Sequence, residues 1–521
     1  MSVGVARPRS ARDLFSARWL PVVATVISAV LFLILQPNVN DLQAALSRQS
    51  AAAHGVGLTY WFSWFSGGAT PGQYSLLTPY LTDVFTVAGT AAIAALLTVL
   101  LTQRAVRDLP YAQEAVWAAT LASSYSMWQG RVPFALGTAA TVVVAIGFRE
   151  RRTAVLLAGA VVSVTLSPVS GAFIAFGLAT VFLVDHRTRR LSLYGCVTAL
   201  ASLIVVAIVF GSPGPEGFSL IAAAITSAAV LIFLVADPPA EIRLLCLFAA
   251  VGSLLLVTFP NGMGSNFSRL VWIVLPPLVV ATARAPRRLA VFAVIPALAM
   301  GCYFTVQDLY HSHQPASTAS YYRPLGQELD RLPDMKQYRL EVVQDDSEHT
   351  GAYALLSHAS LARGWETQED NQYNSVLKSR ATLNAISYKV WLDDNAVGYV
   401  ALGTKVVHNQ AEHNLVARGN LPYLHRVWSN PDWVLYRVSG ATPIVAPPQR
   451  VVSSTQSQLV VQVRCTCRFP IRLRYSKFLQ AATVDGRTQA TVTDDGTGWT
   501  DVRVPRPGRY VLKGKLVGPF H

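Results

Sequence analysis

Charge is scarce in this chain of 521 residues, of which 14% are charged and 52% are hydrophobic. Lysine is absent from the first part of the chain and first occurs at Lys336. A soluble chain of this size seldom combines so few charges with a positive mean hydropathy. These features exclude an entirely soluble fold, and we predict a membrane protein that carries a soluble part.

Sequence motifs of several common enzyme classes are also missing. The chain has no P-loop, no GxGxxG fingerprint, no HExxH motif and no paired CxxC motif. Nucleotide-driven pumping and common metal hydrolysis therefore have no support in the sequence. We predict no metal site and name no certain cofactor, because no motif supports a divalent metal.

Cysteine is rare, with five residues in the chain. Three of them, Cys196, Cys246 and Cys302, lie in or beside apolar runs, where cysteine packs as a small hydrophobic side chain. The other two, Cys465 and Cys467, form a CxC on a predicted strand, so both side chains are expected on one face. We predict that this spacing is too tight for an ordinary disulfide, and a lone CxC is weak evidence for a metal site.

Long apolar runs recur from Leu20 to Val306 and then stop. Their length is about that of a helix that crosses a bilayer. We predict a mainly α membrane protein with about eleven transmembrane helices in residues 1–309. The predicted spans are 19–36, 81–101, 112–127, 134–148, 153–169, 172–184, 191–210, 218–235, 244–259, 270–283 and 289–306.

Arginine is unevenly distributed over the loops between these spans. If the N-terminus is cytoplasmic, only Arg48, Arg131 and Arg269 fall on the outer side, and every other arginine before residue 300 falls on the inner side. Such a bias sets the orientation of multi-pass proteins. We predict a plasma-membrane protein with a cytoplasmic N-terminus, an uncleaved first span and an extracytoplasmic C-terminal region. The net charge of +14 then reflects orientation, and no nucleic acid partner is expected.

The three outer arginines lie beside predicted mouths of the membrane part. In one interpretation each of them snorkels or forms an ion pair. In the other they bind an anion, and arginine suits the phosphate of a lipid carrier better than other side chains do.

The first outer loop, residues 37–80, holds the carboxylate with the clearest catalytic potential. The pattern from Asp41 to Ala53 predicts an interfacial helix that would hold Asp41 at the bilayer surface. There Asp41 could act as a general base, or it could only cap the helix. The candidate substrate-binding residues are Arg48, His54, Trp61, Trp64, Tyr74, Asp83, Arg131 and Arg269. For His54 and for Asp83, predicted to start the second span, capping is the alternative.

Glycine, proline and aromatic residues crowd the segment WFSGGATPGQYSLLTPYLTDVFT, from Trp64 to Thr86. Its glycines allow bends that a regular helix could not make. We predict that it forms the wall of a lipid-facing cleft. Four aromatic residues are expected at headgroup level, as membrane anchors or as sugar platforms: Trp61, Trp64, Tyr74 and Tyr80.

The soluble part is predicted to contain two extracytoplasmic domains. Residues 310–440 form an α/β domain, with strands at YRLEVV, VGYVAL and WVLYRVSG and a helix at SYKVWLDDN. Its stretches 361–374 and 418–433 are rich in side chains that contact sugars, or they are only well-packed loops. Residues 441–521 begin with a proline-rich linker and continue as short strands separated by DG, DDGTG and RPG turns, which predicts a β-sandwich.

This layout resembles the GT-C superfamily of integral-membrane glycosyltransferases. The segment WFSGGATPGQYSLLTPYL is similar to the "W..GG.P.G.Y..L.PYL" segment of multi-pass bacterial members, and the tail from RYSKFLQAATVDGRTQATV to WTDVRVPRPGRYVL is similar to their terminal β-domain. The resemblance implies transfer of a sugar from a polyprenyl-phosphate carrier to a cell-envelope glycan or lipid at the outer face of the membrane. It also implies that Asp41 is the base, although many members have paired acids in this loop.

The arginine-rich, alanine- and valine-rich membrane half is typical of a high-GC bacterium such as an actinobacterium. In such cells polyprenyl-phosphate arabinose and mannose serve cell-wall biogenesis, so these are the donors to test first. Two other classes remain open. A non-catalytic membrane scaffold or glycan-binding protein fits the lone acid, and a lipid-linked-sugar transporter fits less well because the spans hold almost no charge.

Overall fold

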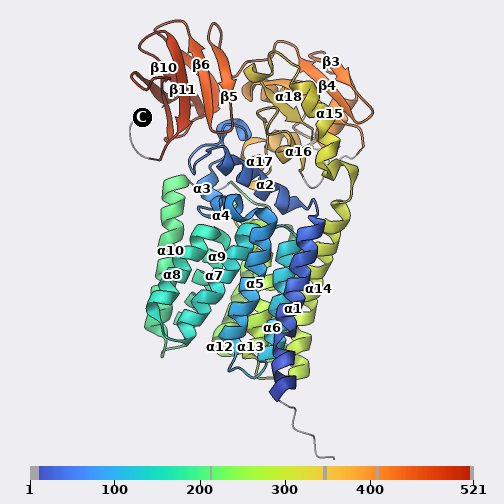
Figure 1. Ribbon diagram of the computed structural model, residues 1–521, viewed down its shortest axis with the longest axis vertical. Helices are drawn as coiled ribbons and strands as arrows, with labels where there is room; N and C mark the ends of the chain where they lie inside the picture. The colour runs from blue at the N-terminus through green and yellow to red at the C-terminus, as the bar shows by residue number, and fades with distance from the viewer. Residues whose placement is uncertain (1–10, 212–213, 344–348, 406–409, 517–521) are drawn as a thin grey trace, which may run out of the picture.

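The computed structural model describes residues 11–211, 214–343, 349–405 and 410–516. A helical bundle forms one half of the molecule, and two domains lie side by side on one end of it (Figure 1). Short helices lie between the bundle and these domains. Residues 1–10, predicted to be cytoplasmic, lie outside the described residues.

Each of the eleven predicted spans overlaps a helix of the bundle. These helices are α1 (Ala11–Leu35), α5 (Val87–Val106), α6 (Ala112–Trp128), α7 (Val132–Arg149), α8 (Thr153–Leu166), α9 (Pro168–Val184), α10 (Arg189–Phe210), α11 (Leu220–Ile232), α12 (Ala240–Thr258), α13 (Leu275–Thr282) and α14 (Arg287–His311). A π-helical turn, Leu270–Val274, leads into α13. The last outer arginine, Arg269, directly precedes that turn.

By length and composition, 7 helical stretches among the described residues are apolar enough to cross a membrane. Three further apolar stretches are shorter: Thr153–Leu166, Pro168–Val184 and Leu220–Ala236. A multi-pass membrane protein is therefore supported, while the number of eleven spans stays a prediction. Large apolar side chains such as Ile34, Ile208 and Ile221 are exposed on the outside of the bundle, as expected of surfaces that face lipid.

The predicted helix at the start of the first outer loop is present as α2 (Asn40–Ala53). It lies beneath the outer domains and packs against α4 (Thr78–Phe85) (Figure 1). The same loop contains η1 (Phe65–Gly67) and α3 (Pro71–Tyr74). Much of α2 is buried, including Ser47 and Arg48. The helix is thus held between protein layers.

The second span begins later than predicted, at Val87. Its predicted start falls in the separate helix α4, which ends before Thr86. Thr86 has a φ of 62°, and its hydroxyl accepts a hydrogen bond of 3.1 Å from the Gly89 amide. The sequence pattern could not show this break, because the apolar residues continue across it.

The predicted α/β unit contains a four-stranded sheet in the order β1-β2-β4-β3. Its strands are β1 (Arg339–Val342), β2 (Val397–Gly403), β3 (Leu424–Ser429) and β4 (Trp433–Val438), and only β1 and β2 pair in parallel. Its helices are α15 (Ala319–Leu329), α16 (Gly351–Ala354), α17 (Thr367–Tyr373), α18 (Ala385–Asp394) and α19 (Gln410–Ala417), with short turns at Pro315–Ser317, Met335–Gln337 and Ser375–Lys378. The three predicted strands and the predicted helix are all present.

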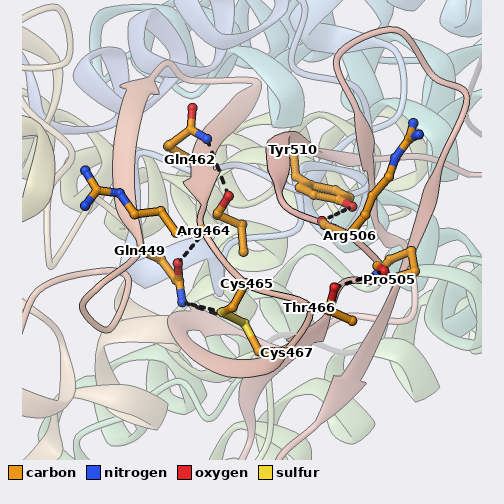
Figure 2. The surroundings of a disulfide bond; sticks show 10 residues. Gln449, Gln462, Arg464, Cys465, Thr466, Cys467, Pro505, Arg506 and Tyr510 are labelled. Carbon is orange, nitrogen blue, oxygen red and sulfur yellow. Dashed lines mark hydrogen bonds between the residues drawn. A yellow bond between two sulfur atoms is a disulfide. The ribbon is translucent and has the colours of Figure 1, made fainter.

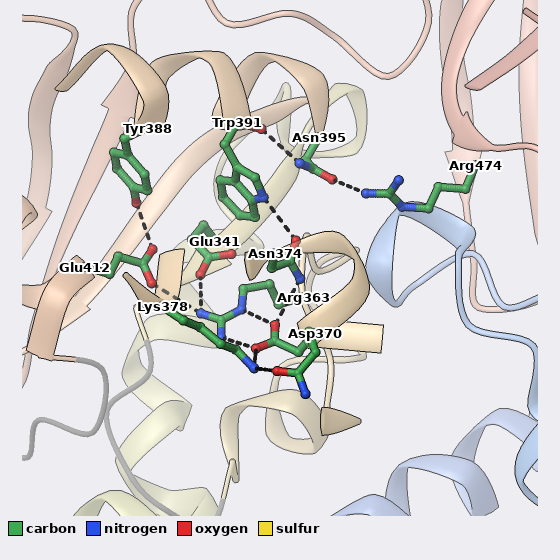
Figure 3. Close-up of polar contacts among 11 residues, drawn as sticks. Glu341, Arg363, Asp370, Asn374, Lys378, Tyr388, Trp391, Asn395, Glu412 and Arg474 are labelled. Carbon is green, nitrogen blue, oxygen red and sulfur yellow. Dashed lines mark hydrogen bonds and ion pairs between the residues drawn. The ribbon is translucent and has the colours of Figure 1, made fainter. Parts of the chain in front are cut away.

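A buried ion cluster fixes the segment that follows β1 (Figure 3). Arg363 contacts Asp370 at 2.8 Å, Glu412 at 3.2 Å and Glu341 at 3.4 Å. Burial and the neighbouring Glu412 hold the pKa of Glu341 well above its usual value. The pKa of Asp370 lies well below its usual value, because Arg363 more than offsets the effect of burial. Arg363 and Asp370 of the predicted sugar-contacting stretch 361–374 therefore have a structural role.

The C-terminal region is β-rich, as predicted, with seven strands in the order β5-β6-β11-β8-β9-β10-β7. They are β5 (Arg450–Ser454), β6 (Gln458–Val463), β7 (Arg468–Arg474), β8 (Leu479–Thr483), β9 (Gln489–Asp494), β10 (Trp499–Arg503) and β11 (Gly508–Gly514). Buried and less buried residues alternate along β6, which is the pattern of a strand with one face on a core.

The prediction for the CxC motif is wrong, because Cys465 and Cys467 form a disulfide (Figure 2). The two cysteines lie in the turn between β6 and β7, where their Cα atoms are 5.4 Å apart. In an extended strand, residues two apart are separated by roughly 6.5 Å and point to the same face. The turn shortens this distance to about the Cα separation that is most common in disulfides, roughly 5.5–6 Å.

Candidate functional site

A cavity of about 450 Å³ lies where the bundle meets the outer loop and the α/β domain. Parts of the chain that are distant in sequence form its walls. The lining residues are Asn40, Asp41, Gln73, Tyr74, Arg131, Pro133, Phe134, Ser167, Pro168, Val169, Ala172, Leu203, Glu216, Gly262, Met263, Ser265, Asn266, Arg269, Asp308, Trp365, Glu366, Thr367 and Gln368. Four of the predicted site residues meet here: Asp41, Tyr74, Arg131 and Arg269.

Asp41 and two of the three outer arginines form an ion cluster in this cavity. Oδ2 of Asp41 accepts from Nε of Arg131 at 3.2 Å and from Nη2 of Arg269 at 3.4 Å. Asp41 lies in the first turn of α2, where the helix dipole favours a carboxylate. The helix has Val39 at its N-cap, so Asp41 does not cap it and the capping alternative is wrong. All three side chains are no more than 20% exposed.

Gly130 brings Arg131 beside Asp41. Its φ of +73° lies in the left-handed region, and a Cβ atom at this position would approach the Leu42 backbone nitrogen to 2.4 Å. Only glycine allows both this conformation and this close contact. The chain can therefore pass directly against the start of α2 before α7 begins.

Replacing Gly130 by Ala should lower the stability of the protein by roughly 1–3 kcal/mol, since it adds both backbone strain and a steric clash. Thermal unfolding of the full chain in detergent measures this effect. Gly57→Ala is the matched control, because nothing lies within 4 Å of its Cβ position. Equal melting temperatures for the two variants would contradict the packing described here.

Besides Glu366 of the α/β domain, two further carboxylates line the cavity, Glu216 and Asp308. Glu216 accepts a hydrogen bond of 2.9 Å from Ser265, and its burial raises its pKa. Both acids are recognisable in the sequence as outer-face residues, but nothing in their spacing shows that they converge on Asp41. Among the described residues, no group of three His, Cys, Asp or Glu side chains is arranged to hold a metal ion.

Arg48 lies beneath the cavity wall and is not one of its lining residues. Its Nη2 donates to Glu366 of the α/β domain at 2.6 Å, and its guanidinium carbon lies 3.6 Å from the ring centroid of Tyr74. Only 5% of the side chain is exposed. For Arg48 the structure supports the ion-pair interpretation, because its guanidinium is paired with Glu366 and the residue does not line the cavity. Arg48 instead fixes two lining residues, Glu366 and Tyr74.

Trp61 and Trp64 are not at headgroup level, and that prediction is also wrong. Their rings stack 4.1 Å apart in a buried cluster beneath the α/β domain. The indole nitrogen of Trp64 donates to the Ala352 carbonyl at 3.2 Å. By contrast, the side chain of Tyr80 is 43% exposed, at the edge of this layer. The two tryptophans join the outer loop to the domain above it.

His54 and Asp83 do not line the cavity either. His54 follows the last residue of α2 as its C-cap, and its Nδ1 lies 2.7 Å from the Ser50 carbonyl oxygen, which is a capping contact. Asp83 is exposed on α4, four residues before the second span begins, so it does not cap that span. Neither contributes to the site.

The α/β domain contributes Trp365, Glu366, Thr367 and Gln368 to the cavity, all from the stretch predicted to contact sugars. The indole nitrogen of Trp365 is buried without a hydrogen-bond partner among the described residues, and so is Oδ1 of Asn40. A buried polar atom without a partner is costly. Such atoms beside a cavity can be satisfied by a polar ligand or by water.

The cavity as a whole combines one carboxylate held by two arginines, three further acids (Glu216, Asp308 and Glu366) and an aromatic side. It can bind an anionic group at the arginines and remove a proton at a carboxylate a few ångströms away. Both capacities rest on side chains from separate parts of the chain: the first outer loop, the α6–α7 connection and the turn before α13.

No family model matches the chain, and no curated protein matches it. Among solved structures, ArnT from Cupriavidus metallidurans bound to undecaprenyl phosphate matches with a TM-score of 0.43 at 14% identity, over 82% of this chain and 98% of that one. Arabinofuranosyltransferase AftD from Mycobacteria matches with a TM-score of 0.46 at 14% identity, over 96% of this chain and 57% of that one.

Arabinosyltransferase EmbB from Mycobacterium smegmatis matches with a TM-score of 0.31 at 11% identity, over 99% of this chain and 64% of that one. The chain thus spans well under two thirds of AftD and somewhat under two thirds of EmbB. At TM-scores below 0.5, these similarities carry no argument about the family or the activity of this chain.

Proposed function

We propose that this chain is a membrane glycosyltransferase that moves a sugar from a polyprenyl-phosphate carrier to a cell-envelope glycan or lipid. The single observation that carries the proposal is the contact of Asp41 with both Arg131 and Arg269 in one cavity. A base and two phosphate-binding groups are what this reaction requires. Arabinose and mannose are the donor sugars to test first.

In the proposed reaction, Asp41 accepts the proton of an acceptor hydroxyl, and the hydroxyl oxygen attacks the anomeric carbon of the sugar. The bond from that carbon to the phosphate oxygen breaks, and polyprenyl phosphate leaves. Negative charge grows on the phosphate during this step, so arginines beside it stabilise the transition state more than the ground state. Both arginines contact Oδ2 of Asp41, so Oδ1 is the oxygen proposed to take the proton.

The arginines are proposed to exchange partners when the carrier binds. Without a carrier both arginines are paired with Asp41 and occupy its Oδ2. A phosphate in the cavity competes for the same guanidinium groups and would release Asp41. The base would thus become active only when the donor is present.

An outer-face location for the cavity is supported by two independent features. The arginine bias predicts that the loops carrying Asp41, Arg131 and Arg269 lie outside. The disulfide in the β-rich domain fits an oxidising compartment, whereas the cytosol keeps thiols reduced.

Replacing Arg131 or Arg269 by Gln should raise the KM for a polyprenyl-phosphate sugar by about 10- to 100-fold, since a hydrogen bond to a charged group is worth about 1.5–3 kcal/mol. Transfer of a labelled sugar by the full chain in nanodiscs measures this. The matched control is Arg152→Gln, whose side chain is 63% exposed and lies on the predicted inner side. An unchanged KM for both cavity variants would exclude these arginines as the phosphate site.

A second candidate function is the non-catalytic scaffold. It is favoured by the same ion cluster, because a carboxylate that neutralises two arginines can serve only to hold the bundle and the outer loop together. Substitution of Asp41 by Asn separates the two functions, because only the transferase requires a side chain that accepts a proton.

A further inference from the structure

A second cavity, of about 260 Å³, lies at the junction of the outer loop, the α/β domain and the β-rich domain. It shares no lining residue with the cavity around Asp41. Its walls are formed by Ser63, Leu329, Asp330, Leu332, Pro333, Met335, Lys336, Tyr338, Leu356, Ser357, His358, Ala359, Ser360, Ser454, Thr455 and Gln456. The three parts of the chain meet here and leave a space between them.

Hydroxyl groups from two domains meet in the lining of this space. Ser360 of the α/β domain and Ser454 of β5 approach to 3.2 Å through their Oγ atoms. Ser357 and Thr455 add further hydroxyls to the lining. Such groups both donate and accept hydrogen bonds, which suits a ligand that carries many hydroxyls of its own.

A buried amide oxygen in the lining has no hydrogen-bond partner in the part of the chain that the structure describes. Gln456 is 6% exposed, and its Nε2 donates to Ser50 at 3.0 Å. Its Oε1 has no hydrogen-bond partner among the described residues. Leaving a buried acceptor unpaired costs about 1–3 kcal/mol, so the site favours a ligand that donates a hydrogen bond here.

The remaining lining is apolar and nearly balanced in charge. Met335, Tyr338 and Leu356 supply apolar surface, on which the C–H face of a sugar ring can pack. Lys336 is opposed by Asp330, which also holds His358 at 3.0 Å. This balance gives no net attraction for an anion. The volume is slightly below the roughly 300 Å³ at which typical ligand pockets begin, so the cavity suits a short ligand.

We propose that this cavity binds a sugar unit of a neutral glycan and is a carbohydrate subsite separate from the cavity around Asp41. The inference goes beyond the proposed transfer reaction, since it requires binding alone. In the complex, a sugar hydroxyl donates to Oε1 of Gln456, and the serine hydroxyls bind the neighbouring oxygens. Residues from all three parts of the chain thus contact the glycan.

Saturation-transfer difference NMR on the full chain in nanodiscs tests this proposal, with linear mannotriose and linear arabinotriose as neutral probes and glucuronic acid as an anionic one. Saturable binding of a neutral probe is expected. Ser357→Trp should fill the cavity and weaken binding at least tenfold, because Ser357 is exposed at its edge. The matched control is Ser439→Trp, at an exposed serine outside the cavity, which should bind as the unchanged protein does.

Two further variants keep the result decisive. Gln456→Met removes the unpaired acceptor at similar volume and should also weaken binding at least tenfold, and it decides the outcome if Ser357→Trp unfolds. Asp41→Asn should leave this binding unchanged, whatever it does to sugar transfer. The proposal is overturned if neither neutral probe binds, if only glucuronic acid binds, or if binding is lost in Asp41→Asn and kept in Ser357→Trp and Gln456→Met.

Discussion

Replacement of Asp41 by Asn is expected to abolish sugar transfer while the protein still folds. Asparagine has nearly the same shape, but its amide cannot accept a proton from the acceptor hydroxyl. Loss of a general base costs about 10²–10⁴-fold in rate. The rate of transfer from polyprenyl-phosphate arabinose and mannose to a membrane acceptor measures the effect, and the melting temperature of the purified variant reports folding.

Asp83→Asn is the matched control, because Asp83 is exposed on α4 and lies outside the cavity. It should transfer sugar at a rate within about twofold of the unchanged protein, since surface substitutions of this kind have small effects. Full transfer activity in a well-folded Asp41→Asn variant would rule out Asp41 as the base. It would favour the scaffold function, in which Asp41 only neutralises Arg131 and Arg269.

The same variant reports on the proposed exchange of arginine partners. Without the negative charge of Asp41, Arg131 and Arg269 lose the group that competes with phosphate. Polyprenyl phosphate should therefore bind Asp41→Asn at least as tightly as it binds the unchanged protein. Weaker binding of the carrier to this variant would show that Asp41 helps to shape the phosphate site.

The bundle helices and the strands of the outer domains are predicted well from the sequence, because the residue patterns that indicate them are local. Apolar runs of bilayer length predict the bundle helices, and alternating residues with turn motifs predict the strands of the outer domains. The break at Thr86 has no such signal, since an apolar run continues across it. The disulfide between Cys465 and Cys467 was not predictable either, because no strong sequence signal marks the turn that brings the Cα atoms together.

The candidate site was predictable only in part, for a similar reason. The avoidance of arginine on the outer face singles out Arg131 and Arg269, and both contact Asp41 in the structure. The same rule singles out Arg48, whose neutralising partner Glu366 lies 318 residues away in the chain. Whether an outer arginine can bind a ligand depends on tertiary contacts of this kind. Such contacts cannot be inferred from a single sequence.

The aromatic residues of the first outer loop show the same limit. A rule based on composition assigns Trp61 and Trp64 to the membrane interface. The structure buries both under the α/β domain, where they pack between protein layers rather than contact lipid. The loop between the first two spans thus packs beneath the outer domains. This packing explains why glycine and aromatic residues are so frequent in the loop.

Replacing Arg363 by Met should destabilise the α/β domain by about 3–5 kcal/mol, the usual cost of removing one partner from a buried ion cluster. Arg363 is 9% exposed, and its loss would leave Glu341, Asp370 and Glu412 close together without their shared cation. Thermal unfolding of the full chain in detergent measures the change. The control is Arg487→Met, whose side chain is 84% exposed and whose loss should shift stability by less than about 0.5 kcal/mol.

The destabilisation by Arg363→Met should also depend on pH, and the shifted pKa values give its sign. Arg363 lowers the pKa of Asp370, so this carboxylate contributes stability above the ordinary pKa of Asp, and the contribution disappears as the pH falls through the lowered value. Burial keeps the pKa values of Glu341 and Glu412 above their usual values even beside Arg363, which lowers both; without Arg363 they rise further, and more stability is lost as the pH rises above the unfolded pKa values. The difference in melting temperature between the two proteins should therefore be larger at pH 7.5 than at pH 5, and an equal or smaller difference at pH 7.5 would contradict the role assigned to Arg363.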